Sequence, residues 1–386
     1  MVVGQLGNYL IMNTINAKKS EIHFDRQIND AKDNIRHIKF PLHLLSGGAN
    51  KERKMVIFLG EDFRNMLGIN LELTIEISNQ CLDYVRRECK GYELFYKPHP
   101  AETDEYQKLN LEGFKMMGHE SVELIFMENA KNIYHIFSTC SGASTTAYDF
   151  GLNSSVFLDV LAPAFGRFNT DAIKKYLYLL PQSCFINDLS KPLCSNKKSD
   201  QDDGTLAKNI EDLINDRTGT VWMLVGDAGA IPRAKVIEEL VKEHNPKMVF
   251  HLVPTQHHRW KTIPMDKVRT MFDAVSFVPR VFYSVRPKKI LNAWRAACLI
   301  RKWPVGKDDI IISSLGLSFS DDCFVSYFPQ VPKVALMPKD FFNVTCGEQT
   351  LDAKRYTRRA GATFFNHILE PLLGIERTQY AEATWR

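Results

Sequence analysis

The stretch from Lys54 to Gly60 reads KMVIFLG, a short apolar run rich in β-forming residues that ends at a glycine. The next stretch, from about Leu71 to Lys90, has Leu, Ile and Val at helical spacing. The same alternation of strands and helices continues at Tyr92–Tyr96, Val122–Asn129, Asn132–Ser138 and from about Ser144 onward. Strands that alternate with helices predict a parallel, Rossmann-like sheet.

A second series of strands and helices follows a polar stretch. From Leu193 to Lys208 the sequence is charged and poor in large apolar residues, which is typical of an exposed linker. Beyond it we expect strands at Val221–Val225, Met248–Val253, Ala274–Val278, Asp309–Ser313 and Lys333–Met337, and helices at Ala234–His244 and Lys288–Trp303. The prediction is an α/β fold with two Rossmann-like domains, residues 1–195 and 218–386, joined by a linker at 196–217.

Composition argues against several classes of protein. Lysine and arginine outnumber acidic residues by only 49 to 45 and are scattered, so no nucleic-acid-binding face is expected. None of the eight cysteines forms a C-x-x-C pair or a Cys/His cluster at zinc spacing, which favours a reduced, cytoplasmic protein. The N-terminus lacks a signal-peptide pattern, and no run approaches the roughly 20 apolar residues that span a bilayer. If the protein acts at a membrane, we therefore expect it to bind the inner face of that membrane without crossing it.

A rigid loop with a histidine follows the strand at Tyr92–Tyr96. The loop reads Lys97-Pro98-His99-Pro100, so the imidazole is expected at the carboxyl end of a parallel sheet, where such folds bind ligands. Prolines on both sides restrict the backbone and hold one side chain in a set direction. A rigid histidine beside a lysine suits a phosphate, although a purely structural histidine between two prolines is the alternative.

A run of small hydroxyl residues, Ser138 to Thr146 (STCSGASTT), follows the strand at Asn132–Ser138 and leads into a helix. Backbone N–H groups at a helix start, with hydroxyls as extra donors, form an anion site that needs no metal. An ordinary helix cap is the alternative. Between the two loops, Glu123 is our candidate for hydrogen bonds to ribose hydroxyls, with a merely solvated carboxylate as the alternative.

The order of KPHP, the V-E-L-I segment at Val122 and S-x-x-S-x-x-S-T resembles the donor-binding half of GT-B glycosyltransferases that build bacterial surface glycans. The likeness is greatest to CMP-sialic acid transferases and their polysialic acid and Kdo relatives, and covers Lys54 to Asp159. It implies that His99 contacts the donor phosphate and assists its departure as an acid, and that Glu123 holds the ribose. It further implies phosphate contacts from Ser138, Ser141, Ser144 and Thr145. We complete the predicted donor site with Gly60, Lys97, Pro100 and Thr139.

The resemblance also implies a general base from the acceptor half. We favour Asp322, with Asp321 and Asp227 as alternatives, although Cys323 stands where the family often has glycine. The first half has no D-x-D motif at a strand end, so we expect chemistry without a metal or any cofactor besides the CMP-sugar donor. The donor-like half also comes first here, the reverse of the usual order. A permuted enzyme, part of a tandem transferase and a homodimer that completes the cleft all fit that order.

The expected function is transfer of sialic acid or a related acidic sugar from a CMP-sugar to a surface glycan. The expected partners are the nucleotide sugar and the glycan acceptor, and peripheral membrane association stays open. One alternative is a CDP-glycerol-type glycerophosphotransferase. Another is a nucleotide-binding protein without catalysis.

Overall fold

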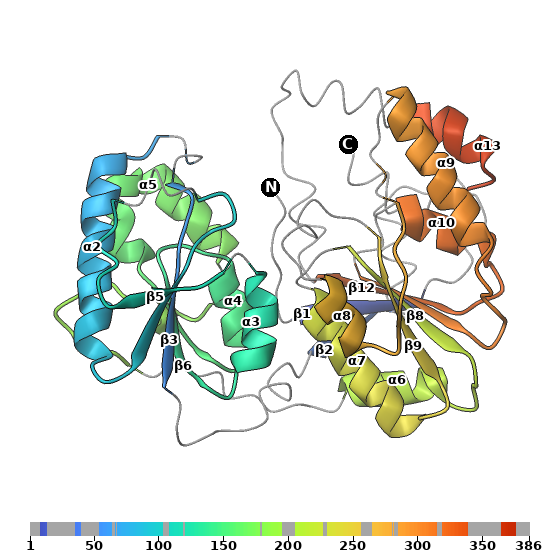
Figure 1. Ribbon diagram of the computed structural model, residues 1–386, viewed down its shortest axis with the longest axis horizontal. Coiled ribbons are helices and arrows are strands. Elements are labelled where there is room, and N and C mark those ends of the chain that lie inside the picture. The colour runs from blue at the N-terminus through green and yellow to red at the C-terminus, as the bar shows by residue number, and fades with distance from the viewer. Residues whose placement is uncertain are drawn as a thin grey trace. The chain divides into compact units, whose positions relative to one another are not determined.

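The computed structural model describes residues 8–13, 35–39, 54–63, 66, 68–102, 108–118, 120–177, 180–194, 205–226, 230–255, 265–279, 281, 285–314, 319–338 and 364–375. The chain divides into two compact units, the first from Met1–Gly7 and Pro41–Asp202, the second from Asn8–Phe40 and Asp203–Arg386. Each unit contains a mostly parallel sheet with helices on both faces (Figure 1). The predicted α/β fold with two Rossmann-like units is therefore confirmed.

The first unit has a parallel five-stranded sheet in the order β5-β4-β3-β6-β7. Counted along the chain within the unit, this is the 3-2-1-4-5 order of one Rossmann half, with its switch point between β3 and β6. The strands are β3 (Met55–Leu59), β4 (Glu93–Lys97), β5 (Phe114–Met116), β6 (Ile133–Ser138) and β7 (Asn153–Val156).

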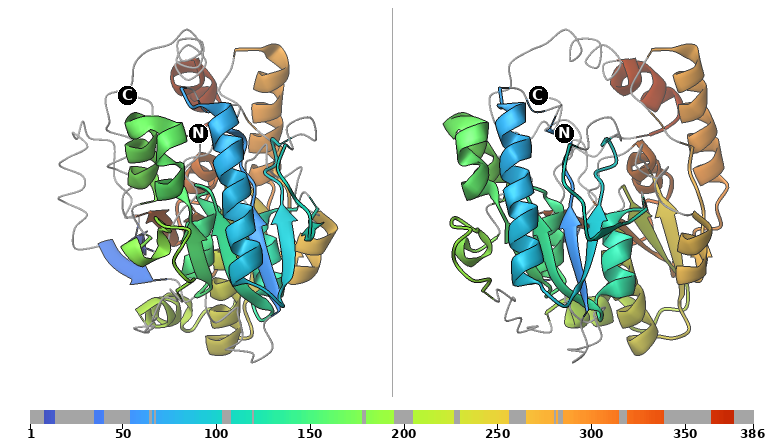
Figure 2. Two further views of the ribbon diagram at one scale, coloured as in Figure 1. Left: turned by 90° about the vertical axis from the view of Figure 1, so that its left-hand side faces the viewer. Right: turned by 60° about the vertical axis from the view of Figure 1, so that its left-hand side comes forward.

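Helices cover both faces of this sheet. On one face α2 (Leu71–Glu88) packs beside α5 (Leu158–Tyr176), and on the other α3 (Val122–Asn129) packs beside α4 (Ala143–Asp149) (Figures 1 and 2). A short 3₁₀ helix, η5 (Gln182–Cys184), follows. In the core, the ring of Phe157 stacks on those of Phe58 and Phe137, with centroids 6.1 and 5.8 Å apart. This aromatic packing joins β3, β6 and the end of β7 into one layer.

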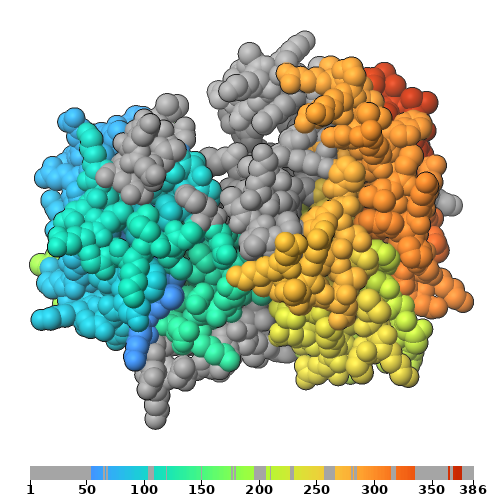
Figure 3. Space-filling model, viewed as in Figure 1, coloured from blue at the N-terminus to red at the C-terminus, as the bar shows by residue number. Residues whose placement is uncertain are grey.

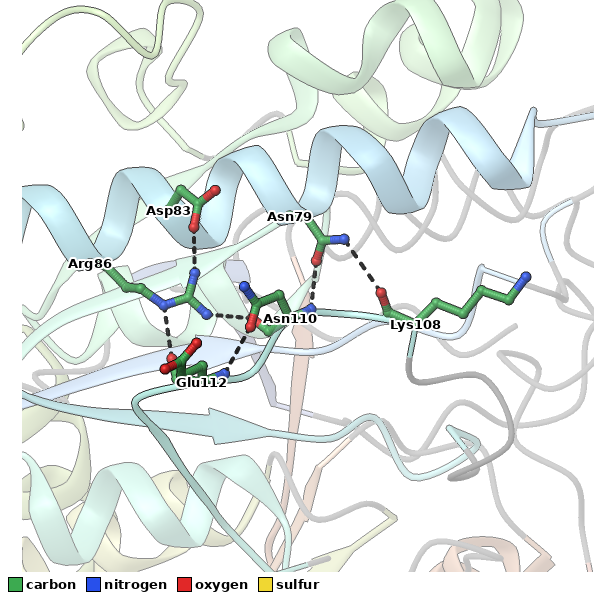
Figure 4. Close-up of polar contacts among 6 residues, drawn as sticks. All are labelled: Asn79, Asp83, Arg86, Lys108, Asn110 and Glu112. Atoms are coloured by element: carbon green, nitrogen blue, oxygen red, sulfur yellow. Dashed lines mark hydrogen bonds and ion pairs between the residues drawn. The ribbon is translucent and has the colours of Figure 1, made fainter.

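Polar side chains of α2 tie that helix to the loop before β5 (Figure 4). The Asn79 amide donates to the carbonyl of Lys108 over 3.4 Å, and its oxygen accepts from the N–H of Asn110 over 2.7 Å. Arg86 donates to the carbonyls of Glu112 and Asn110. These bonds satisfy loop backbone groups that no strand pairs.

The second unit has a seven-stranded sheet in the order β10-β9-β8-β11-β12-β1-β2. Its five parallel strands again follow the 3-2-1-4-5 order, and the hairpin of β1 and β2 is added antiparallel to β12. The strands are β8 (Thr220–Val225), β9 (Val249–Pro254), β10 (Ala274–Val275), β11 (Ile310–Ser314), β12 (Lys333–Pro338), β1 (Asn8–Asn13) and β2 (Ile35–Lys39).

The helices of the second unit also lie on both faces of its sheet (Figure 1). One group is α6 (Thr205–Ile214), α7 (Ala230–His244) and α8 (Met265–Met271), and the other is α9 (Pro287–Arg301), α10 (Phe319–Tyr327), the π-helix η7 (Phe365–Leu369) and α13 (Glu370–Leu372). Trp222 of β8 stacks on Trp303, with ring centroids 5.3 Å apart. Among the described residues, no helix combines the length and apolar character needed to cross a membrane.

The boundaries of the units differ from the predicted domains in two places. The predicted linker 196–217 includes α6, whose Leu206, Ile210 and Ile214 are buried in the second unit. The segment Asn8–Phe40, predicted within the first domain, belongs to the second unit, because β1 pairs with β12. Both differences arise from contacts that a polar composition or a local strand pattern does not reveal.

Candidate functional site

The carboxyl edge of the first sheet gathers the predicted donor-site residues of that unit. Gly60 follows β3, the Lys97–Pro100 loop begins at the end of neighbouring β4, and Thr139 follows β6 on the other side of β3. Ligands of open α/β sheets bind at this edge, outside the point where strand order reverses. The residues predicted from the sequence therefore lie at the sheet edge where the strand order reverses.

Hydrogen bonds from the loop itself hold His99. The N–H of His99 donates to Oε2 of Glu102 over 3.0 Å, and the N–H of Glu102 donates to the carbonyl of His99 over 2.9 Å. The N–H of Ala101 donates to Nδ1 of His99 over 3.2 Å. A neutral imidazole whose Nδ1 accepts a hydrogen bond carries its proton on Nε2. His99 is half-buried and Pro100 is exposed, so the imidazole lies at the sheet edge with part of its surface covered.

Lys97, which the sequence analysis included in the donor site, is buried. Only 4% of its surface is exposed, and Nζ donates to the carbonyl of Pro98 over 2.9 Å. Burial lowers the pKa of Lys97, while the charges of Glu123, Glu102 and Glu120 act in the opposite direction. The structure thus brings Lys97 and Glu123 into electrostatic contact from different elements, β4 and α3.

Most of the hydroxyl run lies inside the protein. Ser138, Ser144 and Thr145 are almost completely buried, as is Thr139, and the hydroxyls of Ser138 and Ser144 are hydrogen-bonded to each other over 2.7 Å. The Ser138 hydroxyl also accepts from the N–H of Ser141 over 3.2 Å. Ser141 is partly exposed. The interior serines therefore shape the loop that presents Ser141, a local role the sequence pattern also allowed.

Glu123 lies in the first turn of α3 and is half-buried. Its carboxylate accepts a short hydrogen bond from the hydroxyl of Ser121. This contact restricts the side chain, as a group that positions a ligand requires. A helix start is also a favourable place for a carboxylate in the absence of any ligand.

Three residues that the sequence analysis did not select lie beside the histidine loop. The hydroxyl of buried Tyr96 donates to Oε1 of Glu102 over 2.7 Å. Burial raises the pKa of Glu102. Glu61, directly after Gly60, has one carboxyl oxygen buried without a hydrogen-bond partner among the described residues. Burial, with the charges of Glu102 and Asp62, raises its pKa to about 8.

Gly60 has a packing role at this edge. A Cβ added to it would lie 2.5 Å from the Tyr96 hydroxyl and closer still to the Glu102 carboxylate. Its N–H donates to the carbonyl of Lys97 over 2.8 Å. The missing side chain therefore makes room for the Tyr96–Glu102 pair that holds the histidine loop. The only signal for Glu61 in the sequence was its place directly after a strand that ends in glycine.

The candidate bases belong to the second unit, after β11. Asp321 and Asp322 lie in the first turn of α10, with 4% and 0% of their surfaces exposed. The hydroxyl of Ser313 donates to Oδ1 of Asp321 over 2.6 Å. The alternative base, Asp227, lies outside the described residues. Asp321 and Asp322 thus lie in the interior of the second unit.

No group of three or more His, Cys, Asp or Glu side chains in the described part of the chain is arranged to hold a metal ion. Metal-independent chemistry remains a prediction.

The two units define the chain as an α/β protein with two Rossmann-like sheets. No protein-family profile matches it, and neither does any curated protein. Among solved structures it is similar to a glycosyl transferase family 9 protein from Veillonella parvula DSM 2008, with 11% identity over 84% of this chain and 99% of that chain. The TM-score is 0.16, so this likeness carries no argument about function.

Proposed function

We propose that the chain is a glycosyltransferase that moves sialic acid or a related acidic sugar from a CMP-sugar to a surface glycan. In this proposal the nucleotide binds at the carboxyl edge of the first sheet, without a metal ion. The observation that supports it most is the orientation of His99, held by Ala101 so that a neutral ring directs its proton from Nε2. A hydrogen-bond donor that is already oriented before the reaction stabilises the negative charge that develops on a departing phosphate.

The contact with Ala101 refines the role of this histidine. An imidazolium has no acceptor nitrogen, so protonation of Nδ1 would break the bond from the Ala101 N–H. His99 therefore serves as a hydrogen-bond donor to the phosphate more readily than as its acid. The raised pKa of Glu61 agrees with a bound anion, because a neutral carboxyl at the same edge does not repel phosphate.

A second candidate function is nucleotide binding without catalysis. It is favoured by the burial of Asp321 and Asp322, because a general base must reach the acceptor hydroxyl. As the second unit stands, Asp321 also accepts a hydrogen bond from Ser313. For either carboxylate to act as base, the first turn of α10 would have to open.

Calorimetric titration with CMP, CDP, UDP, GDP and ADP tests the proposed site. We expect selective binding of CMP that weakens about tenfold or more in His99→Ala, since a hydrogen bond to a charged group contributes roughly 1.5–3 kcal/mol. The matched control is His244→Ala, an exposed histidine of α7 whose loss should leave binding unchanged. No nucleotide binding, or purine binding indifferent to His99, would contradict the proposal.

Incubation with CMP-sialic acid and a glycan acceptor separates the two candidates. A transferase releases CMP and yields a glycan extended by one sugar. A binding protein retains CMP affinity and yields neither product.

A further inference from the structure

The outer face of α9 combines cationic and apolar side chains. Residues 285–307, which include the helix, contain no Asp or Glu and seven basic residues: Arg286, Lys288, Lys289, Arg295, Arg301, Lys302 and Lys307. The net charge of the whole chain is only +4, so positive charge is concentrated in this segment relative to the chain as a whole. The orange atoms of this part of the second unit lie at the surface of the space-filling view (Figure 3).

Small side chains pack α9 against its own unit. Ala293, Ala296 and Ala297 are buried, as is Ile300, and all four belong to the core that α9 shares with α10. The buried face uses mainly alanine, and three of the larger apolar residues of the helix are exposed. Trp294 is 50% exposed, and Leu291 and Leu299 are 46% and 37% exposed.

The exposed residues form one stripe along the helix. Lys288, Leu291, Arg295, Cys298 and Lys302 follow one another at alternating spacings of three and four residues, and all five are exposed. Residues at these spacings share one helix face. Trp294 and Leu299 are exposed beside these five residues. We name this set the α9 stripe, residues Lys288, Leu291, Trp294, Arg295, Cys298, Leu299 and Lys302.

One basic residue of the helix has a different role. The Arg301 guanidinium donates to the carbonyl of Leu373 over 2.8 Å and lies 4.5 Å above the ring of Tyr327. Arg301 thereby connects α9 to α10 and to the residue that follows α13. We therefore leave it out of the stripe.

We propose that the α9 stripe docks the second unit on an anionic membrane surface, with the helix axis parallel to the bilayer. Trp and Leu on such a helix enter the boundary between headgroups and acyl chains, while Lys and Arg extend toward the anionic headgroups. Clustered cations near an anionic leaflet add attraction that falls with salt. A symmetric pairing of two copies is disfavoured, because the same unbalanced cations would face each other.

Co-sedimentation of the full chain with vesicles tests this proposal without any donor or acceptor. We expect binding to phosphatidylcholine vesicles that contain phosphatidylglycerol, weak binding to pure phosphatidylcholine, and a loss of binding as salt rises. Lys288→Glu combined with Arg295→Glu should weaken binding about 25-fold or more, from about fivefold for each cation. A blue shift of tryptophan fluorescence on binding should largely disappear in Trp294→Ser.

The matched control is Lys208→Glu combined with Lys247→Glu, which changes the net charge equally at exposed positions on α6 and after α7. Equal circular dichroism spectra and unfolding temperatures would show that all variants fold. If both double variants lose binding equally, or if anionic vesicles bind no better than neutral ones, the stripe is not a membrane-docking surface. A dimer in solution that Trp294→Ser disperses would assign the stripe to a second copy and overturn the proposal.

Discussion

The carboxyl group of Glu61 makes the stability of the protein depend on pH in an unusual direction. Its pKa is raised from the ordinary value of 4.5 to about 8 by burial and by the neighbouring charges of Glu102 and Asp62. The folded protein therefore holds this proton between those two pH values, whereas the unfolded chain releases it. The stabilisation is complete below pH 4.5 and is lost as pH rises through 8.

The size of the effect follows from the pKa shift. A rise from 4.5 to about 8, at about 1.4 kcal/mol for each pH unit, corresponds to about 5 kcal/mol. Because part of the Glu61 surface is exposed and solvent screens the charge there, we expect about 2–5 kcal/mol. Glu61→Gln retains the size of the side chain and removes the titration. The variant should be only slightly more stable than the wild type at pH 5 and clearly more stable than it at pH 9.

Urea unfolding at pH 5, 7 and 9, followed by circular dichroism, measures the difference between the two proteins at each pH. Glu112→Gln, at an exposed glutamate whose side chain takes part in none of the contacts drawn in Figure 4, is the matched control and should show a nearly constant difference. If the difference for Glu61→Gln is the same at pH 5 and pH 9, the carboxyl of Glu61 is not held in its neutral form. The reasoning from burial would then be refuted.

Two further changes test the contacts around the candidate site. Gly60→Ala should destabilise the protein by about 1–3 kcal/mol because its methyl group overlaps both the Glu102 carboxylate and the Tyr96 hydroxyl, and adding Tyr96→Phe, which removes one of these two overlaps, should restore part of this loss in thermal unfolding. An additive double variant would contradict that explanation. Asn79→Ala should cost about 1–2 kcal/mol in urea unfolding, because both of its bonds to the loop before β5 are lost. A change below about 0.3 kcal/mol would mean that these bonds contribute little.

Local patterns in the sequence were sufficient for most of the secondary structure. The apolar run at Lys54–Gly60 corresponds to β3, and the helix expected at Val122–Asn129 has those bounds in the structure. Such elements can be predicted because their apolar residues recur with the period of one strand or one helix. The strand at Tyr92–Tyr96 also sufficed to predict His99 at the carboxyl edge of a sheet.

The roles of individual side chains at the site depend on contacts between distant segments. In the sequence, Ser138 and Ser144 cannot be told apart from Ser141. In the structure, the hydroxyls of Ser138 and Ser144 form a hydrogen bond with each other inside the fold. Glu61 looks like an ordinary acidic residue after a strand. Its pKa rises only because the fold buries it near Glu102, forty-one positions further along the chain.

The sequence by itself determined the α/β class, the alternation of strands and helices and the position of the histidine loop, because these follow from local periodicity and from chain connectivity. Only the tertiary structure decided that β1 joins β12, that α6 belongs to the second unit, and which polar side chains are buried. Strand pairing and burial both depend on which distant segments come together. No local pattern of residues encodes that information.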